Sequence, residues 1–256
     1  MQVVILAGGL GTRLSEETTL RPKPMVEIGG QPILWHIMKI YASYGHTDFI
    51  VCLGYKGYMI KEYFSNYFLH TSDVTLDIAN NSMSVHDKRA EPWRVTLVDT
   101  GDNSGTGGRL KRVRDYLDDG DFFFTYGDGV SDVNLDELLR VHRKQKTLAT
   151  VTAVQTQSRY GELLIVNNRV EKFREKPADA DEWINGGFFA LSTNVIDYID
   201  SEETHFELAP LTQLAEQGQL SAYRHRGFWQ SMDNLRDKIY LEELWATENP
   251  PWRIWQ

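Results

Sequence analysis

A glycine-rich segment near the start of the chain has residue types that suit phosphate binding. Residues 6–14 read LAGGLGTRL, and glycine lets backbone N–H groups approach phosphate oxygens closely. The segment also contains the planar guanidinium of Arg13, and a lysine that stands between two prolines follows nine residues after its end. We predict a loop that wraps the phosphates of a nucleoside triphosphate, with contacts from Leu6, Ala7, Gly8, Gly9, Gly11, Thr12, Arg13 and Lys23.

Two other glycine motifs fit this segment less well. A dinucleotide-binding fingerprint needs a third glycine where Leu14 stands, and the prolines at 22 and 24 interrupt the helix that should follow. A P-loop needs Gly-Lys followed by Ser or Thr, and the segment lacks that sequence. On the glycines alone, a plain glycine turn stays open as an alternative.

Two aspartates have positions that suit a metal ion. Asp128 follows the apolar run 122–126 and lies between two glycines, and Asp233 follows the aromatic stretch 228–230. Mg²⁺ prefers oxygen ligands and often takes only one or two carboxylates. Each residue also has an ordinary explanation, because Asp128 suits a turn and Asp233 suits the start of a helix. The two lie far apart in sequence, so only the fold could bring them together.

A second glycine-rich segment, TGDNSGTGGR at 100–109, could bind a nucleobase. Cytosine and uracil exchange hydrogen-bond donors and acceptors at N3 and at the exocyclic C4 group. A protein that distinguishes them must pair these groups, because a mispaired buried group is costly. A flexible surface loop is the alternative, and the arginine could instead start a helix or touch the triphosphate. We predict nucleotide contacts from Ser104, Thr106, Gly108 and Arg109.

The elements that must position these residues alternate along the chain. Short apolar runs predict buried strands at 3–7, 48–53, 122–126 and 149–153, and amphipathic stretches predict helices at 34–44, 58–67, 108–117 and 135–146. This order indicates an α/β, Rossmann-like fold with a mixed, mainly parallel sheet flanked by helices. Ligands bind at the carboxyl ends of such strands, so the segments after Ala7, Asp99 and Tyr126 should converge on one edge.

The remaining segments predict smaller features. Two short alternating stretches within 70–95 predict a projecting hairpin, and residues 162–174 predict a second hairpin. Asn234 is predicted to cap a long final helix, with Asp237 three residues further on. We expect the aromatic tail ENPPWRIWQ to dock on this chain or on a neighbouring one.

Composition excludes several classes of function. Hydrophobic residues make up 41% and charged residues 25%, as in ordinary globular proteins. The formal net charge of −9 gives no general attraction to nucleic acid or to anionic membrane. No apolar run approaches the ~20 residues that a membrane span needs. We expect no nucleic-acid partner, no membrane partner, no signal peptide and a cytoplasmic location. The single cysteine, Cys52, is expected to be a buried spectator.

The motifs together resemble a known family. LAGGLGTRL…PKPMVEIGGQPILWH resembles the N-terminal signature of the sugar-1-phosphate nucleotidylyltransferases, which have the nucleotide-diphospho-sugar transferase fold. Four further motifs follow in the family's order, namely YGDG at 126–129, EKP at 175–177, NGGFF at 185–189 and GFWQSMDNLRD at 227–237. These enzymes join a nucleoside triphosphate to a sugar 1-phosphate and release pyrophosphate.

The resemblance implies roles for individual residues. It implies that Arg13 and Lys23 act in catalysis, and that Asp128 and Asp233 hold Mg²⁺, with Asp128 also at the nucleotide. It implies one domain over 1–256, with a nucleotide-binding half at 1–155 and a sugar-binding half at 156–256. It implies sugar-phosphate contacts from Gly161, Glu175, Lys176, Asn185 and Gly187.

The pattern is most similar to the members of the family that use CTP and glucose 1-phosphate as substrates. Thymidylyl or uridylyl transfer to a related sugar 1-phosphate stays open, as does a non-catalytic sugar-nucleotide sensor. The hairpin at 70–95 and the tryptophan-bearing tail also suggest a homo-oligomer.

Overall fold

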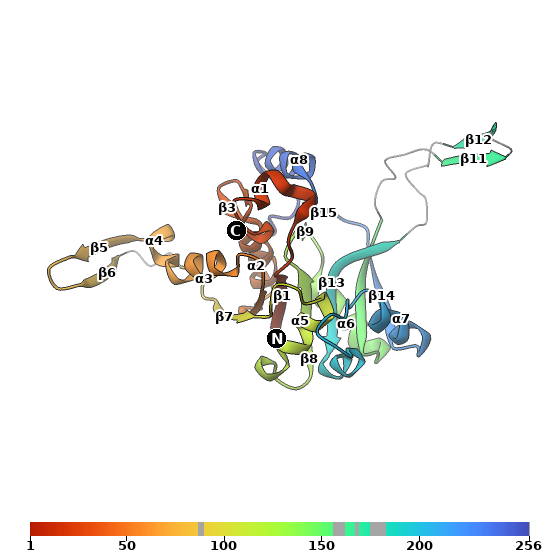
Figure 1. Cartoon of the computed structure of the whole chain (residues 1–256), viewed down its shortest axis with the longest axis horizontal. Helices are drawn as coiled ribbons and strands as arrows, with labels where there is room; N and C mark the ends of the chain where they lie inside the picture. The colour runs from red at the N-terminus through yellow and green to blue at the C-terminus, as the bar shows by residue number, and fades with distance from the viewer. Residues whose placement is uncertain (87–89, 156–161, 167–168, 175–182, 256) are drawn as a thin grey trace.

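A central sheet organises the molecule. The computed structural model describes residues 1–86, 90–155, 162–166, 169–174 and 183–255. Within these residues the sheet has seven strands in the order β14-β10-β13-β8-β1-β4-β7 (Figure 1). The strands are β1 (Gln2–Ala7), β4 (Asp48–Leu53), β7 (Arg94–Asp99), β8 (Asp121–Tyr126), β10 (Ala149–Val154), β13 (Ile184–Ser192) and β14 (Leu220–His225).

The strand directions confirm the predicted mixed, mainly parallel sheet. β1 is parallel to β4 and β8, β4 is parallel to β7, and β10 is parallel to β14. β13 runs antiparallel to both of its neighbours, β8 and β10. The carboxyl ends of β1, β4, β7 and β8 therefore lie at one edge, where the chemically suggestive segments begin.

The helices agree with the predicted positions to within a few residues, with one exception. The predicted helix at 108–117 is a short helix that starts earlier, α5, followed by a 3₁₀ turn at Arg114–Tyr116. Asn234 caps α8 through a capping box with Asp237, as expected. The helices are α1 (Ser15–Thr18), α2 (Ile33–Ser43), α3 (Gly57–Ser65), α4 (Tyr67–Thr71), α5 (Thr106–Arg112), α6 (Leu135–Gln145), α7 (Ala209–Glu216) and α8 (Leu235–Trp245).

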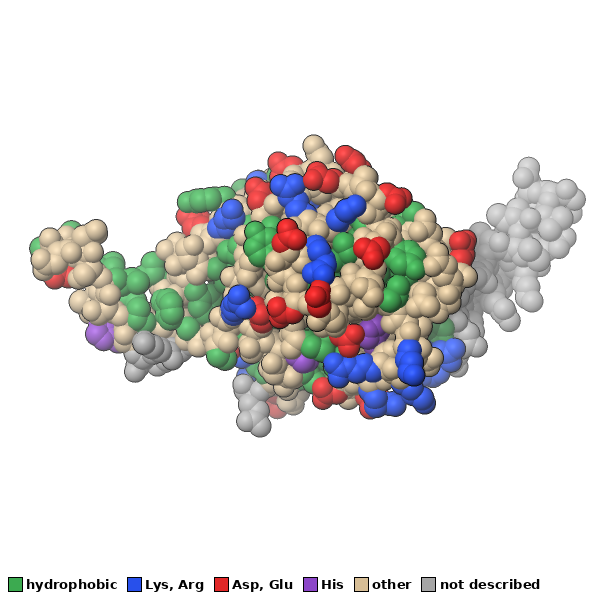
Figure 2. Space-filling model, turned by 90° about the horizontal axis from the view of Figure 1, so that it is seen from below, with side chains coloured by type: hydrophobic (Ala, Val, Ile, Leu, Met, Phe, Trp, Pro, Cys, Tyr) green, Lys and Arg blue, Asp and Glu red, His purple; other side chains and the backbone are tan. Residues whose placement is uncertain are grey.

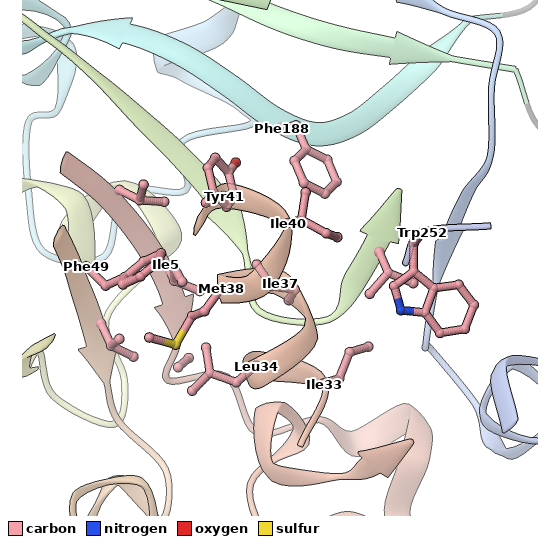
Figure 3. Close-up of a cluster of buried hydrophobic side chains, with 14 of the residues drawn as sticks. Ile5, Ile33, Leu34, Ile37, Met38, Ile40, Tyr41, Phe49, Phe188 and Trp252 are labelled. Atoms are coloured by element: carbon pink, nitrogen blue, oxygen red, sulfur yellow. The ribbon is translucent and has the colours of Figure 1, made fainter. Parts of the chain in front are cut away.

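Both faces of the sheet are covered, as the continuous apolar strands predicted. Successive residues of β1 alternate between two buried clusters, so that Ile5 packs on the face of α2 and α6 while Val4 packs on the face of α5 and α7. Figure 3 shows the first cluster, where α2 packs Ile37 and Tyr41 toward the sheet. Cys52 is fully buried on the second face, and burial raises the pKa of its thiol to about 12, which fits a spectator.

The smaller predicted features are also present. β5 (Asp73–Asp77) and β6 (Ser82–His86) form an antiparallel hairpin that projects beyond α3 and α4 at the left of Figure 1. β11 (Glu162–Val166) pairs antiparallel with β12 (Arg169–Arg174), and residues 167–168 between them lie outside the described residues. Two short pairs complete the fold, β2 (Glu27–Ile28) with β3 (Gln31–Pro32) and β9 (Gly129–Ser131) with β15 (Trp229–Ser231).

The aromatic tail packs on its own chain. Trp252 is fully buried and stacks on Phe228 and Trp245, with ring centroids 5.6 and 5.8 Å away (Figure 3 shows its position). The buried ring of His36 lies in the same aromatic group, and burial lowers its pKa to about 4. No helix of the described part of the chain is both long and apolar enough to cross a membrane.

Candidate active site

The carboxyl edge of the sheet opens on a cavity of about 780 Å³. The segments after β1, β7 and β8 all reach it, which confirms the predicted convergence. Gly108 does not line the cavity, because it packs against the backbone of Glu202. Gly161, Glu175 and Lys176 lie outside the described residues. The predicted residues that line it are Leu6, Ala7, Gly8, Gly9, Gly11, Thr12, Arg13, Lys23, Ser104, Thr106, Arg109, Asp128, Asn185, Gly187 and Asp233.

The fold brings the two distant aspartates together through a short strand pair. β9 and β15 are antiparallel, and Gly129 pairs with Ser231. The amide of Met232 donates to the carbonyl of Asp128 at 2.8 Å, which extends the pairing beyond the strands. Asp128 and Asp233 therefore lie on neighbouring segments of the chain, at the same end of the β9–β15 strand pair.

Lys23 joins the two carboxylates. Its Nζ lies 2.6 Å from Oδ2 of Asp128 and 3.0 Å from Oδ1 of Asp233. The lysine opens a 3₁₀ turn, Lys23–Met25, and its side chain is only 10% exposed. A buried ammonium is costly unless it is paired, so this contact holds three separate parts of the chain in one place.

Electrostatic attraction favours the charged forms of Lys23 and Asp233. Burial alone would lower the pKa of Lys23, but attraction to Asp128 and Asp233 outweighs it and raises that pKa above its usual range. Burial alone would raise the pKa of Asp233, but Lys23, a hydrogen bond from Ser231 and the charge of Arg13 lower it. The guanidinium of Arg13 lies 3.1 Å from Asp233 on a side chain that is 75% exposed. Two cations thus balance two carboxylates.

Arg109 joins the two glycine-rich segments. Its buried guanidinium donates to the carbonyls of Gly8, Leu53, Gly101 and Asp102 and to the hydroxyl of Thr100, at 2.7 to 3.2 Å. This arginine therefore fixes the shape of both segments by bonding their backbone.

Two glycines of the first segment differ in what surrounds them. A Cβ on Gly8 would stand 2.1 Å from Nη1 of Arg109, so this glycine makes room for the arginine. A Cβ on Gly9 would meet nothing within 4 Å, so the space beside Gly9 is open to a ligand. Gly8 thus allows the arginine to pack against the segment, and Gly9 leaves its backbone accessible to a ligand.

The hydroxyls predicted to contact the nucleobase are already bonded within the protein. Ser104 Oγ donates to the carbonyl of Thr100. Thr106 Oγ1 donates to Glu207 at 2.6 Å and accepts from the amide of Phe206 at 2.8 Å. Asp102 and Asn103 also line the cavity, and their place inside the 100–109 segment is the signal that could have singled them out.

On the side of β13, an asparagine and a tyrosine form one unit. Asn185 Nδ2 donates to the phenol oxygen of Tyr126 at 3.1 Å, and Asn185 Oδ1 accepts from the amide of Gly187 at 2.8 Å. Gly187 has a φ of +79°, and a Cβ there would stand 2.5 Å from the ring of Tyr126. Sequence reasoning missed Tyr126 as a site residue, although it begins the YGDG motif.

The chain belongs to the nucleotidyl transferase family, whose model matches residues 2–240. It is 59% identical over 257 residues to the glucose-1-phosphate cytidylyltransferase of Salmonella typhi, and 42% identical over 256 residues to the probable glucose-1-phosphate cytidylyltransferase of Bacillus subtilis. Both alignments cover both chains in full. The resemblance stated from the motifs is therefore confirmed.

Solved structures agree on the fold. The crystal structure of HddC from Yersinia pseudotuberculosis matches 96% of this chain and 99% of its own, with a TM-score of 0.71 and 25% identity. A putative glucose-1-phosphate thymidylyltransferase from Bacillus anthracis matches with a TM-score of 0.64 at 19% identity. The predicted nucleotide-diphospho-sugar transferase fold is confirmed.

Replacing Arg109 with lysine tests its role as the tie between the glycine-rich segments. A lysine ammonium has three donors and no planar fork, so Arg109→Lys leaves buried carbonyls unpaired. We expect the free energy of unfolding to fall by about 2 kcal/mol, measured by urea denaturation. Arg112→Lys, at a half-exposed guanidinium of the same helix, is the matched control and should change little. Equal stability of the two variants would contradict this role.

Proposed function

We propose that this chain transfers a cytidylyl group from CTP to glucose 1-phosphate and yields CDP-glucose and pyrophosphate. The observation that carries the proposal is the meeting of Lys23, Asp128 and Asp233 in a cavity that the first glycine-rich segment also lines. Full-length identity of 59% to a glucose-1-phosphate cytidylyltransferase supports this choice of nucleotide and sugar.

The reaction requires neutralisation of the negative charge on both reactants, and it does not require a nucleophilic side chain. A phosphate oxygen of glucose 1-phosphate attacks the α-phosphorus of CTP, a new P–O bond forms, and the bond to the pyrophosphate breaks. Both reactants are anions, so positioning and electrostatic stabilisation lower the barrier. The open backbone beside Gly9, with Arg13 and Lys23, would hold the triphosphate and neutralise the departing pyrophosphate.

Nucleotidyl transferases of this family generally use a divalent metal ion. The residues present fit one, because Asp128 and Asp233 converge on a single cation, the ammonium of Lys23. Carboxylate oxygens are the donors that Mg²⁺ prefers, and one or two of them suffice when substrate phosphates complete the set. We propose that these two aspartates hold Mg²⁺, which would neutralise phosphate charge when bound.

Lys23 must change partners on this proposal. Its ammonium now contacts the oxygens that would hold the metal ion. A bound triphosphate offers new anionic partners to Lys23 and to Arg13, so both cations can leave the carboxylates without becoming unpaired. The nucleotide and the divalent ion are therefore expected to bind as a pair.

We base the proposed sugar-binding residues on the resemblance to the family and on the position of β13 beside the cavity. Asn185 and Gly187 stand in the cavity wall beside Tyr126. We propose that they contact the glucose ring, with Gly161 and Glu175 beside it and Lys176 at its phosphate. We likewise propose base contacts by the 100–109 segment, through its backbone and through Asp102 and Asn103.

We also propose that the chain self-associates through its projecting arm. We define the arm as residues 67–86, which comprise α4, β5, β6 and the residues that connect them. Figure 2 shows hydrophobic side chains along it at the left of the view. A lone two-stranded hairpin cannot bury its own apolar side chains, so a second copy of the chain is the proposed partner. The exposed apolar residues at the arm are Phe68, Leu69, Leu76, Ile78 and Met83.

Static light scattering tests this association. The wild-type chain should have the mass of two or more copies, and the double variant Leu76→Asp with Ile78→Asp should shift to one copy. Leu208→Asp, at an exposed leucine just before α7, is the control and should keep the wild-type mass. A monomeric wild-type chain would refute the association.

Pyrophosphate-release assays of different substrate combinations test which nucleotide and which sugar 1-phosphate the protein uses. Four nucleoside triphosphates are assayed against glucose 1-phosphate and other sugar 1-phosphates, with and without Mg²⁺. We expect CTP with glucose 1-phosphate to be turned over fastest, and only with the metal ion. A faster pair containing dTTP or UTP would favour the thymidylyl or uridylyl alternative. No turnover in any well would favour a non-catalytic sensor.

Substitution of either aspartate tests the proposed metal site. Asp128→Asn and Asp233→Asn each remove one anionic oxygen while an amide oxygen can still accept from Lys23. We expect kcat to fall by about 10²- to 10³-fold, as when a transition-state stabilising group is lost, with circular dichroism unchanged. Asp119→Asn, whose side chain is 88% exposed, is the control. Wild-type rates in either site variant would rule out the two-carboxylate site.

A further inference from the structure

Glu207 is a cavity residue that the sequence did not single out. It lies between the 3₁₀ turn Thr193–Tyr198 and α7, and its half-buried side chain lines the cavity. Oε2 accepts a hydrogen bond from Thr106 Oγ1, and Oε1 accepts one from the Tyr126 hydroxyl, both at 2.6 Å. These lengths are typical of a hydroxyl that donates to an ionised carboxylate.

The charge of Glu207 needs an explanation in this cavity. Within the described part of the chain, neither lysine nor arginine forms an ion pair with it. A carboxylate repels the phosphates that the proposed reaction would bring into the same space. Its function therefore depends on a group that can accept two hydrogen bonds at once. Here one carboxylate oxygen accepts from Thr106 and the other accepts from Tyr126.

The first partner, Tyr126, leads directly to the proposed metal ligand. It is the last residue of β8, and Asp128 follows two residues later. Its hydroxyl donates to Glu207 and accepts from Asn185, so both hydrogen-bonding directions of the phenol are fixed.

The second partner, Thr106, leads to the proposed base-binding segment. It is the first residue of α5, and its hydroxyl also accepts from the amide of Phe206, next to Glu207 in sequence. The amides of Gly107 and Gly108 also donate to the carbonyl of Thr204. These bonds connect the first turn of α5 to the segment 204–207. The start of α5 is thus held in place from the 204–207 segment.

We infer that Glu207 is a positioning residue for the transfer reaction, acting through Tyr126 and Thr106. One carboxylate sets the distance between the base-binding segment, the end of β8 that carries Asp128, and the β13 edge at Asn185. The inference rests on the proposed function, since it assigns Glu207 to the alignment of the two reactants. An in-line attack depends steeply on that alignment, and a displacement of about 1 Å can cost about 10²-fold in rate.

Glu207→Gln tests this role because the amide keeps the size of the side chain but offers one acceptor oxygen instead of two. We expect kcat to fall by about tenfold or more, with the KM of each substrate within about threefold of the wild-type value. Glu216→Gln, the same exchange at an exposed position of α7, is the matched control and should leave both constants unchanged.

A double-mutant cycle with Tyr126→Phe shows whether Glu207 acts through the tyrosine. Tyr126→Phe removes the hydroxyl that Glu207 accepts from. If Glu207 acts as inferred, the loss of kcat in the double variant is smaller than the product of the two single losses. Independent effects, or a raised KM for one substrate with kcat unchanged, would overturn the inference in favour of direct substrate binding. A lower melting temperature with unchanged kcat would overturn it in favour of a purely structural role.

Hydrogen exchange of the substrate-free protein gives a readout that does not depend on the reaction. We expect faster amide exchange in peptides covering 100–109 and 122–130 in Glu207→Gln, and wild-type exchange in Glu216→Gln. Unchanged exchange in both peptides would overturn the positioning role. The kinetic cycle uses the substrate pair that the wild-type chain turns over fastest. Failure of the cytidylyl assignment is therefore distinguishable from failure of this inference.

Discussion

The ion pair of Lys23 with Asp128 and Asp233 is the interaction on which the site depends. A nearly buried ammonium must have anionic partners, and each partner here comes from a different part of the chain. The β9–β15 pairing supplies the two carboxylates, and the 3₁₀ turn Lys23–Met25 supplies the lysine. One electrostatic requirement therefore holds three distant segments of the chain together at the wall of the cavity.

Backbone packing explains much of the glycine pattern that first suggests a phosphate site. Gly8 leaves room for Arg109, Gly127 leaves room for the carbonyl of Leu6, and Gly187 leaves room for the ring of Tyr126. Gly9 alone among these four faces open space. The motif thus combines positions that let the loops pack closely with a position where a ligand can approach the backbone. Both needs arise because parallel strands bring their loops to one edge.

Periodicity and residue type predict the strands, the helices and the hairpin well, because each depends on local burial. They predict the glycine-rich segment, Lys23 and the two aspartates as site residues, because types and motif order are visible in the chain. They do not predict the contact between Lys23 and the aspartates, which exists only in the folded sheet. Glu207 has no local signal at all, since its segment matches no motif and its partners are distant in sequence.

Charge balance connects the resting site to the proposed reaction. Lys23 and Arg13 offset Asp128 and Asp233, so these four side chains together carry no net formal charge, although the chain carries a net charge of −9. A triphosphate alone would add uncompensated negative charge, and a divalent ion alone would have to displace two cations. If both bind as proposed, the lysine and arginine would move to the phosphates while the carboxylates would hold the ion. Glu207 stands apart from this exchange because its partners are hydroxyls. It can therefore hold the geometry while the charges nearby rearrange.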